Sequence, residues 1–312
     1  MVFRVSSRLD RTAHLARWSA GIALALMTLV SRAGELAYEP VALGWTAEEV
    51  QQAVHVNYQA IVDRARAAQR FGCQRHCAQL QRVFTRLEAE ARSQTARANT
   101  LPWSLTVVRL DDVEAMALPG GQVVISEAFV DANALDDDAL AFVLAHEMAH
   151  SILEHERQSL TFARMLLPAV PRSVDDMYTE MDMNFSLLKS MELVMQAGEY
   201  EADELGLLMA SEAGFSPEGQ LRFLIGESLK PAGARPLIAT HPPAIDRLER
   251  LRVRLPLAWR LMAQHRELSG VADPAKGDEL KAPMRRDLAC QGRSAGQICV
   301  SNADPRRHRP AG

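Results

Sequence analysis

Five consecutive residues, His146-Glu147-Met148-Ala149-His150, constrain this chain more than any other stretch. They lie in Leu135–His155, a segment whose apolar residues recur with helical spacing. Two histidines four residues apart share one face of an α-helix, so both imidazoles can reach one ion at about 2.0–2.1 Å, the Zn–N distance in proteins. Glu147 lies between them, where its carboxylate can reach a metal-bound water without ligating the metal. The motif therefore predicts a zinc ion on His146 and His150, with Glu147 as the base.

The alternative interpretation is a helix with two histidines that bind nothing. Two features favour the metal. Asp136-Asp137-Asp138 precede the apolar residues and supply an N-cap and a favourable charge for the helix dipole. Burying two histidines and a glutamate in the turns that follow is unfavourable without a partner, and a metal ion is the natural partner for that set.

A second helical segment, Ser186–Ala213, offers the remaining ligand. Glu199 and Asp203 are four residues apart and therefore share a face of this helix. A glutamate from a second helix completes the His, His, Glu set of a zinc hydrolase whose fourth position stays open. We expect Glu199 to be the third ligand, and Asp203 to accept a hydrogen bond from the far nitrogen of a ligand histidine. An acidic, solvated helix face is the alternative, and Glu201 fits that description.

Four motifs in this order resemble metallopeptidase family M48, which includes the CAAX prenyl endopeptidases, a bacterial heat-shock membrane protease and periplasmic quality-control proteases. The match covers roughly residues 45–255, and its motifs are His146–His150, Glu199–Gly206, Thr240-His241-Pro242-Pro243 and Ala115–Gly121. The resemblance implies an α+β fold: a mainly helical, zincin-like (gluzincin) domain with a small β-sheet or hairpin over the active-site helix. Within the family, we expect the periplasmic, soluble branch, without the helical-repeat array that some periplasmic relatives carry.

The same resemblance assigns two further roles. A histidine at the position of His241 hydrogen-bonds the tetrahedral intermediate, or closes over the zinc in a resting state; a capping or surface histidine is the alternative. The strand Glu114-Ala115-Met116-Ala117 would hold the substrate as an added strand, although an ordinary core hairpin fits the same residues. The family commonly has Asn-Ala-Phe where this chain has Glu114-Ala115-Met116, a departure that could alter the polar contact to the substrate backbone. Arg247 could orient the region around His241.

These residues predict a metalloendopeptidase that uses one Zn²⁺, with Glu147 as general base and His241 assisting. The expected partners are polypeptide substrates: exported and misfolded proteins, with envelope and outer-membrane proteins among them. A zinc-stabilised exported binding or chaperone module, with a closed and inert metal site, is the alternative function. A net charge of −4 and the lack of a basic stripe in the body of the chain argue against nucleic acid as a partner.

Residues 1–33 have the composition of a targeting segment, with a basic start and the apolar run Ala20–Val30. The uncharged span between Arg17 and Arg32 is short for the ~20 residues of a transmembrane helix, so we favour a signal peptide cleaved near Ala33. We therefore predict a periplasmic, exported protein. A retained inner-membrane anchor with a periplasmic domain, and hence a membrane-proximal site, is the alternative.

The rest of the chain divides into a zinc metallopeptidase domain (45–265) and a polar, flexible tail (269–312). Residues 45–98 read as two helices, the first begun by a capping box of Thr46 and Glu49, and residues 104–265 as the catalytic core. Within that core we expect a strand at Ser104–Leu110, a hairpin at 113–118 and 122–126, and helices at Pro217–Leu229 and Ala244–Leu255. We expect the last of these helices to turn three apolar side chains inward: Ile245, Leu248 and Leu251.

Three further features leave alternatives open. The methionine-rich segment 157–186, which Pro168 and Pro171 interrupt, is either core or a mobile lid over the cleft. His155 lies about 140° round the helix from His150, so it should not ligate the same ion and belongs behind the ligands or on the surface. Four cysteines in an exported chain predict two disulfides; three pairings are open, and we favour the local pairs Cys73–Cys77 and Cys290–Cys299.

Overall fold

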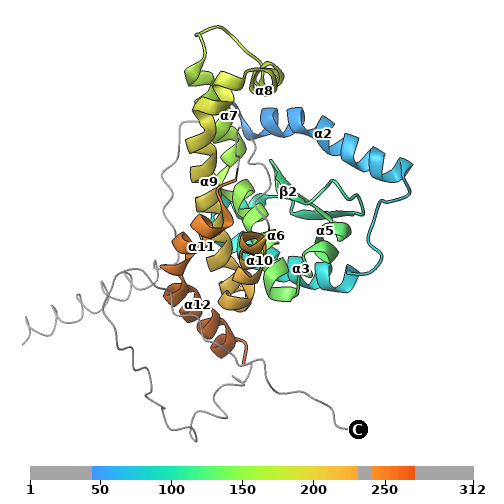
Figure 1. The fold of residues 1–312 in the computed structure, drawn as a ribbon, viewed down its shortest axis with the longest axis vertical. Coiled ribbons are helices and arrows are strands. Elements are labelled where there is room, and N and C mark those ends of the chain that lie inside the picture. Colours follow the sequence, from blue (N-terminus) through green and yellow to red (C-terminus); the bar gives the residue numbers. More distant parts are fainter. Residues whose placement is uncertain (1–43, 231–240, 271–312) are drawn as a thin grey trace, which may run out of the picture. The chain divides into compact units, whose positions relative to one another are not determined.

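The computed structural model describes residues 44–230 and 241–270, which form helices around one small sheet (Figure 1). The α+β prediction is confirmed, because this part of the chain is mostly helical and its sheet has three strands. The predicted leader (1–33), nearly all of the predicted tail, and the pair Cys290–Cys299 lie outside the described residues. Among the helices of residues 44–230 and 241–270, none combines the length and the apolar character needed to cross a bilayer.

The sheet has the strand order β1 (Ser104–Val108), β3 (Gln122–Ser126), β2 (Ala115–Leu118). β3 pairs in parallel with β1 and antiparallel with β2, so the predicted hairpin is present. Gly120 and Gly121 join its two strands with φ angles of +102° and +86°, a conformation that favours glycine. β2 is an edge strand, because in the described part of the chain it pairs with β3 alone.

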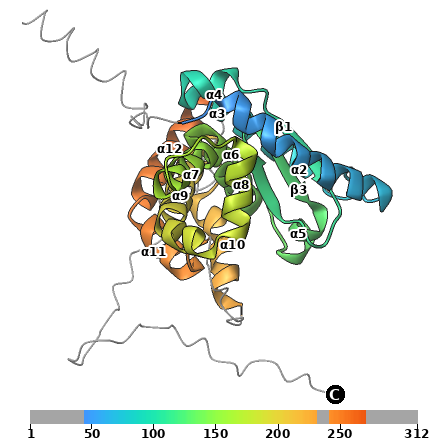
Figure 2. The same cartoon turned by 90° about the horizontal axis from the view of Figure 1, so that it is seen from above.

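Helices cover both faces of this sheet. The side chains of its central strand, β3, point alternately to the two faces, and each set packs against helices. Val124 belongs to an apolar cluster with residues of α2 (Ala47–Ala67), which lies over the sheet in Figure 2. Val123 and Ile125 point to the opposite face and pack into the main core, which includes α3 (Cys77–Gln94) and α6 (Asp137–Leu153). The sheet is therefore a middle layer that presents β2 next to α6.

Helix α6 carries the two motif histidines and packs along α9 (Phe185–Glu212). Asp136 caps α6, since its side chain accepts a hydrogen bond from the backbone N–H of Ala139. Gly206 of α9 allows the two helices to approach closely: a Cβ at this position would lie 2.9 Å from the backbone nitrogen of His146. Because no larger residue fits there, Gly206 sets the distance across which the acidic side chains of α9 reach the histidines of α6.

The remaining helices follow the predictions in part. Thr95 caps a separate short helix with its side chain, so the second predicted N-terminal helix is two helices, α3 and α4. A C-terminal helix, α12, was not predicted. The bounds of these elements are α4 (Ala96–Thr100), α5 (Glu127–Ala132), α7 (His155–Leu166), α8 (Val174–Met183), α10 (Pro217–Leu229), α11 (Ala244–Arg252) and α12 (Leu255–Leu268).

The methionine-rich segment 157–186 forms α7, α8 and the start of α9. Leu160 and Met177 are fully buried in a cluster that also contains residues of α2 and α9, which supports the core interpretation. Met165 and Met183 are 76% and 82% exposed, so the segment is core along only part of its length.

The prediction for the last helix of the motif region was wrong in one respect. Ile245 of α11 is 53% exposed, whereas Arg247 of the same helix is buried. The reason is electrostatic: Arg247 pairs with the buried Asp203, and that contact decides which face of α11 turns inward.

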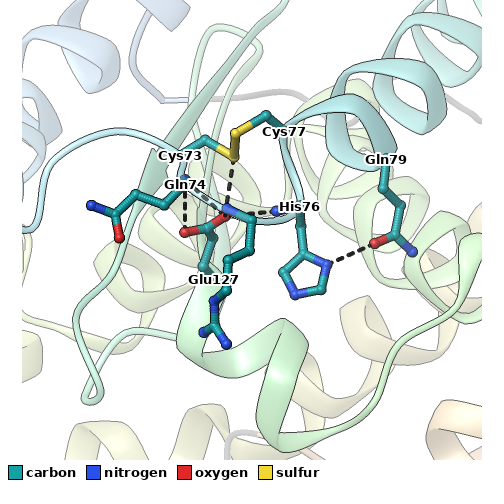
Figure 3. Close-up of a disulfide and its surroundings, with 7 residues drawn as sticks. Cys73, Gln74, His76, Cys77, Gln79 and Glu127 are labelled. Atoms are coloured by element: carbon teal, nitrogen blue, oxygen red, sulfur yellow. Dashed lines mark hydrogen bonds between the residues drawn. A yellow bond between two sulfur atoms is a disulfide. The ribbon is translucent and has the colours of Figure 1, made fainter.

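The structure contains the predicted local disulfide between Cys73 and Cys77 (Figure 3). This pair is four residues apart, a spacing that is awkward inside a continuous helix. Here α3 begins only at Cys77, so Cys73 lies in the preceding loop, after Gly72 with its φ of +84°. The disulfide therefore closes a short loop at the start of α3.

The loop closed by this disulfide surrounds the carboxylate of Glu127, the first residue of α5 (Figure 3). The backbone N–H groups of Gln74, Arg75 and His76 donate to Glu127 Oε1 at 3.0, 2.7 and 2.9 Å. Burial alone would raise the pKa of Glu127, but these three backbone hydrogen bonds outweigh it and lower the pKa. Glu127 thus joins the loop before α3 to the end of β3, and so helps to place the sheet.

We expect Glu127→Gln to destabilise the protein by about 1–3 kcal/mol, because the amide is neutral and its NH2 group cannot accept the second hydrogen bond that Gln74 N–H donates to Oε2. Because the pKa of Glu127 is lowered on folding, its contribution is present above pH 4.5 and is lost as the pH falls through the lower, folded value. Urea unfolding at pH 7 and in acid measures this effect. The difference in free energy of unfolding between wild type and variant should be smaller in acid. The control is Asp112→Asn, which removes an exposed ion pair with Arg64. Equal midpoints for the two variants at pH 7 would contradict the assignment.

Candidate metal centre

Three side chains from two helices converge on one point. His146 and His150 of α6 bring their Nε2 atoms to 3.1 Å from each other. Glu199 of α9 places Oε2 at 3.4 Å from His146 Nε2, and Oε1 at 3.5 Å from His150 Nε2. Atoms that surround a zinc ion tetrahedrally at about 2.1 Å are roughly 3.4 Å apart, so these spacings fit a single zinc site.

One atom of this group lacks the partner that its burial requires. Glu199 Oε2 is buried and lies 3.4 Å from Nε2 of both His146 and His241, but neither contact has the geometry of a hydrogen bond. A buried carboxylate oxygen without a hydrogen bond is costly, and a cation bound by the three side chains would satisfy it. His146, His150 and Glu199 could therefore hold a metal ion.

The far nitrogen of His146 is held by a buried ion pair. His146 Nδ1 lies 3.0 Å from Asp203 Oδ1, and Arg247 donates to both oxygens of Asp203 at 2.7 and 2.5 Å. Burial lowers the pKa of His146, but the adjacent carboxylates of Asp203 and Glu199 outweigh this and raise the pKa to about 10 in the metal-free chain. Two carboxylates around one imidazole supply the negative charge that a divalent cation would neutralise.

The far nitrogen of His150 contacts another histidine. His150 Nδ1 lies 2.9 Å from Nδ1 of His155, whose Nε2 lies 3.2 Å from Oε2 of Glu201. His155 is buried behind the ligands and lies outside the ligand group, as its position on the helix predicted. Glu201 was interpreted as part of a solvated face, and half of its side chain is indeed exposed, but its Oε2 contacts His155.

Glu147 lies between the ligands and the edge strand. Its Oε2 accepts a hydrogen bond from the backbone N–H of Ala117 at 2.7 Å. Burial, the largest influence, raises the pKa of Glu147. A cleft of about 480 Å³ runs past this carboxylate, and its lining includes β2, His150, Glu199 and His241.

The outer edge of β2 faces this cleft. The N–H of Ser126 donates to the carbonyl of Glu114, just before the strand. Because hydrogen bonding alternates along an antiparallel pair, the backbone groups of Met116 also face β3, and those of Ala115 and Ala117 face away from it. The hydrogen bond from Ala117 to Glu147 agrees with that alternation.

His241 approaches the centre without joining the three ligands. Its Nε2 lies 3.4 Å from Glu199 Oε2, and 62% of its side chain is exposed. The sequence predicted that Arg247 orients the region of His241, but in the structure Arg247 forms an ion pair with Asp203 instead.

A second group, Cys73, Cys77 and Glu127, also has its ligand atoms close together, but the two cysteines are bonded to each other and Glu127 accepts backbone hydrogen bonds.

Comparisons with known proteins agree with this geometry. The family model described as "Peptidase family M48" matches residues 74–255, more than half of the chain. The mitochondrial metalloendopeptidase OMA1 of Schizosaccharomyces pombe is 31% identical over 176 residues, which cover 51% of this chain and 48% of that protein. The protein of the same name from Saccharomyces cerevisiae is 29% identical over 203 residues, which cover 59% of this chain and 57% of that protein. The chain thus spans about half the length of these curated relatives.

The prediction of a periplasmic location was wrong, both for a cleaved leader and for an inner-membrane anchor with a periplasmic domain. The relatives are named as mitochondrial proteins, and none of those found is named as a periplasmic one. The physical reason is that an arginine-rich, acid-poor start is common to bacterial signal peptides and to mitochondrial transit peptides, so composition could not separate them. The segment itself, 1–33, lies outside the described residues.

Replacing Arg247 with methionine should destabilise the protein by about 3–5 kcal/mol, because the Asp203 carboxylate would remain buried without its cation. Urea unfolding of the metal-free protein at pH 7 measures the loss. Arg252→Met, an exposed position of the same helix, is the matched control. A loss no larger than that of the control would show that the Arg247–Asp203 pair does not hold α11 in place.

Proposed function

This chain belongs to peptidase family M48, and from that premise we propose that it is a zinc-dependent endopeptidase acting on extended polypeptides. The observation that carries the proposal is the convergence of His146, His150 and Glu199 beside the carboxylate of Glu147. We assign His146, His150 and Glu199 as zinc ligands. Asp203 orients His146 through the 3.0 Å contact to its Nδ1.

A zinc ion in such a site supplies a water of lowered pKa and polarises the substrate carbonyl. Glu147 Oε2 is engaged by the N–H of Ala117, so we assign Oε1 as the oxygen that takes the proton of the attacking water. Burial raises the pKa of Glu147, which suits a group that must first accept this proton and then give it to the leaving amine. The exposed imidazole of His241 donates a hydrogen bond to the developing oxyanion; covering the metal in a resting state is its alternative role.

The free edge of β2 determines how a substrate would bind. The N–H and carbonyl of Ala115 and the carbonyl of Ala117 face away from β3, where an extended peptide can pair with them. Backbone pairing of this kind needs an unfolded segment and selects little by side chain, which favours misfolded polypeptides. The narrower substrate group expected from the sequence, exported and envelope proteins, depended on a periplasmic location, so an unfolded outer-membrane protein serves below as a second unfolded test substrate.

We expect Glu147→Gln to bind one zinc per chain as the wild type does and to lose cleavage by a factor of at least about 10², the lower end of what general bases contribute. The assay measures degradation of casein and of an unfolded outer-membrane protein, with and without a chelator, alongside the metal content. Glu204→Gln, at a partly exposed position of α9 where the carboxylate pairs with Arg254, is the control. Undiminished, chelator-sensitive cleavage by Glu147→Gln would exclude Glu147 as the base. Zinc binding by a wild type that cleaves neither substrate would support a binding or chaperone module instead.

Ala115→Pro should raise KM for casein roughly tenfold, about the value of one hydrogen bond, because proline removes the N–H that faces the cleft. The fold should tolerate the change, since proline is accommodated on edge strands whose N–H points away from the sheet. Ala115→Val, which keeps the N–H, is the control. Steady-state kinetics and zinc content are the measurements, and an unchanged KM for the proline variant would rule out pairing at this position.

A further inference from the structure

The two ligand histidines are supported differently on the side away from the metal. His146 contacts the carboxylate of Asp203 directly, whereas His150 contacts a second imidazole, that of His155. His155 in turn contacts Glu201, which reaches it from α9. His155 is only 7% exposed, and its ring stands at 78° to the ring of His150 with the centroids 4.8 Å apart.

The facing nitrogens restrict the positions of the protons. His150 Nδ1 and His155 Nδ1 are 2.9 Å apart, so one of them must carry a hydrogen and the other must accept it. A histidine that ligates a metal through Nε2 carries its hydrogen on Nδ1, so His150 is the donor. His155 Nδ1 is then the acceptor, and its hydrogen lies on Nε2, where Glu201 Oε2 accepts it at 3.2 Å.

We propose that His155 and Glu201 are positioning residues that fix the tautomer and ring orientation of His150 as a metal ligand. The chain of donors runs in one direction, from His150 through His155 to the Glu201 carboxylate, and so keeps the lone pair of His150 Nε2 directed at the ligand group. This inference rests on the proposed function, since it requires a metal at His146, His150 and Glu199.

A packing role and a positioning role require different properties of residue 155. Packing needs a flat ring of this size, which phenylalanine also supplies. Positioning needs an acceptor where Nδ1 lies, and the side-chain oxygen of asparagine can occupy that place. The two substitutions therefore separate the roles: His155→Phe keeps the ring and removes the acceptor, whereas His155→Asn keeps the acceptor and removes most of the ring.

The test measures the zinc dissociation constant of the full chain by competition with a chromophoric chelator. His155→Phe should weaken zinc binding about 10–100-fold, the usual effect of losing a partner behind a metal ligand. His155→Asn should recover part of that loss, and Glu201→Gln should weaken binding less than His155→Phe. Glu204→Gln is the control on the same helix. Nitrogen-15 NMR of the wild-type imidazoles should show His155 with its hydrogen on Nε2.

Wild-type zinc affinity in His155→Phe, or a greater loss in His155→Asn than in His155→Phe, would overturn the proposal and leave packing as the role of His155. A hydrogen on Nδ1 of His155 in the zinc-loaded wild type would do the same. Failure of the proposed function is distinguishable, because then the wild type itself would bind no zinc or would bind zinc without cleaving.

Discussion

The close contact between α6 and α9 at Gly206 is the constraint on which the site depends. A side chain at this position would collide with the backbone of His146, so only glycine lets the helices approach to this distance. One turn before Gly206, Asp203 meets the far nitrogen of His146, and one turn earlier Glu199 meets the ligand nitrogens. One helix pair, α6 and α9, therefore supplies the ligand group and the carboxylate behind it, and the sheet and remaining helices hold that pair in place.

Burying so many charged groups is tolerable only because each has a partner. Asp203 is 1% exposed, and Arg247 donates to both of its oxygens. Glu199 is the exception, because its Oε2 has no hydrogen-bond donor among the described residues. The same need for partners explains why α11 turns Arg247 rather than Ile245 inward. Among the described carboxylates of this site, the buried oxygen without a hydrogen bond thus lies at the point where the three ligand side chains meet.

Local patterns predicted much of this arrangement. The histidine pair, the capping box at Thr46 and the glycine turn at Gly120 each act over a few residues, so their helices and hairpin were predicted close to the observed bounds. The spacing of Glu199 and Asp203 likewise placed both on the face that meets α6. The contact of Glu201 with His155 was not predicted, because it joins residues 46 positions apart and depends on how α7 and α9 pack. The location was predicted wrongly, because a basic, apolar leader has the same composition for several destinations.

The central claim is that one zinc ion binds at His146, His150 and Glu199, and X-ray absorption at the zinc edge of the purified protein tests it most directly. We predict one zinc per chain, with only nitrogen and oxygen ligands at about 2.0–2.1 Å and the multiple-scattering signal of two imidazoles. Sulfur ligands at about 2.3 Å would place the metal on cysteine side chains instead of this group, and a protein without zinc would leave the histidine pair unexplained. Either result would contradict this account.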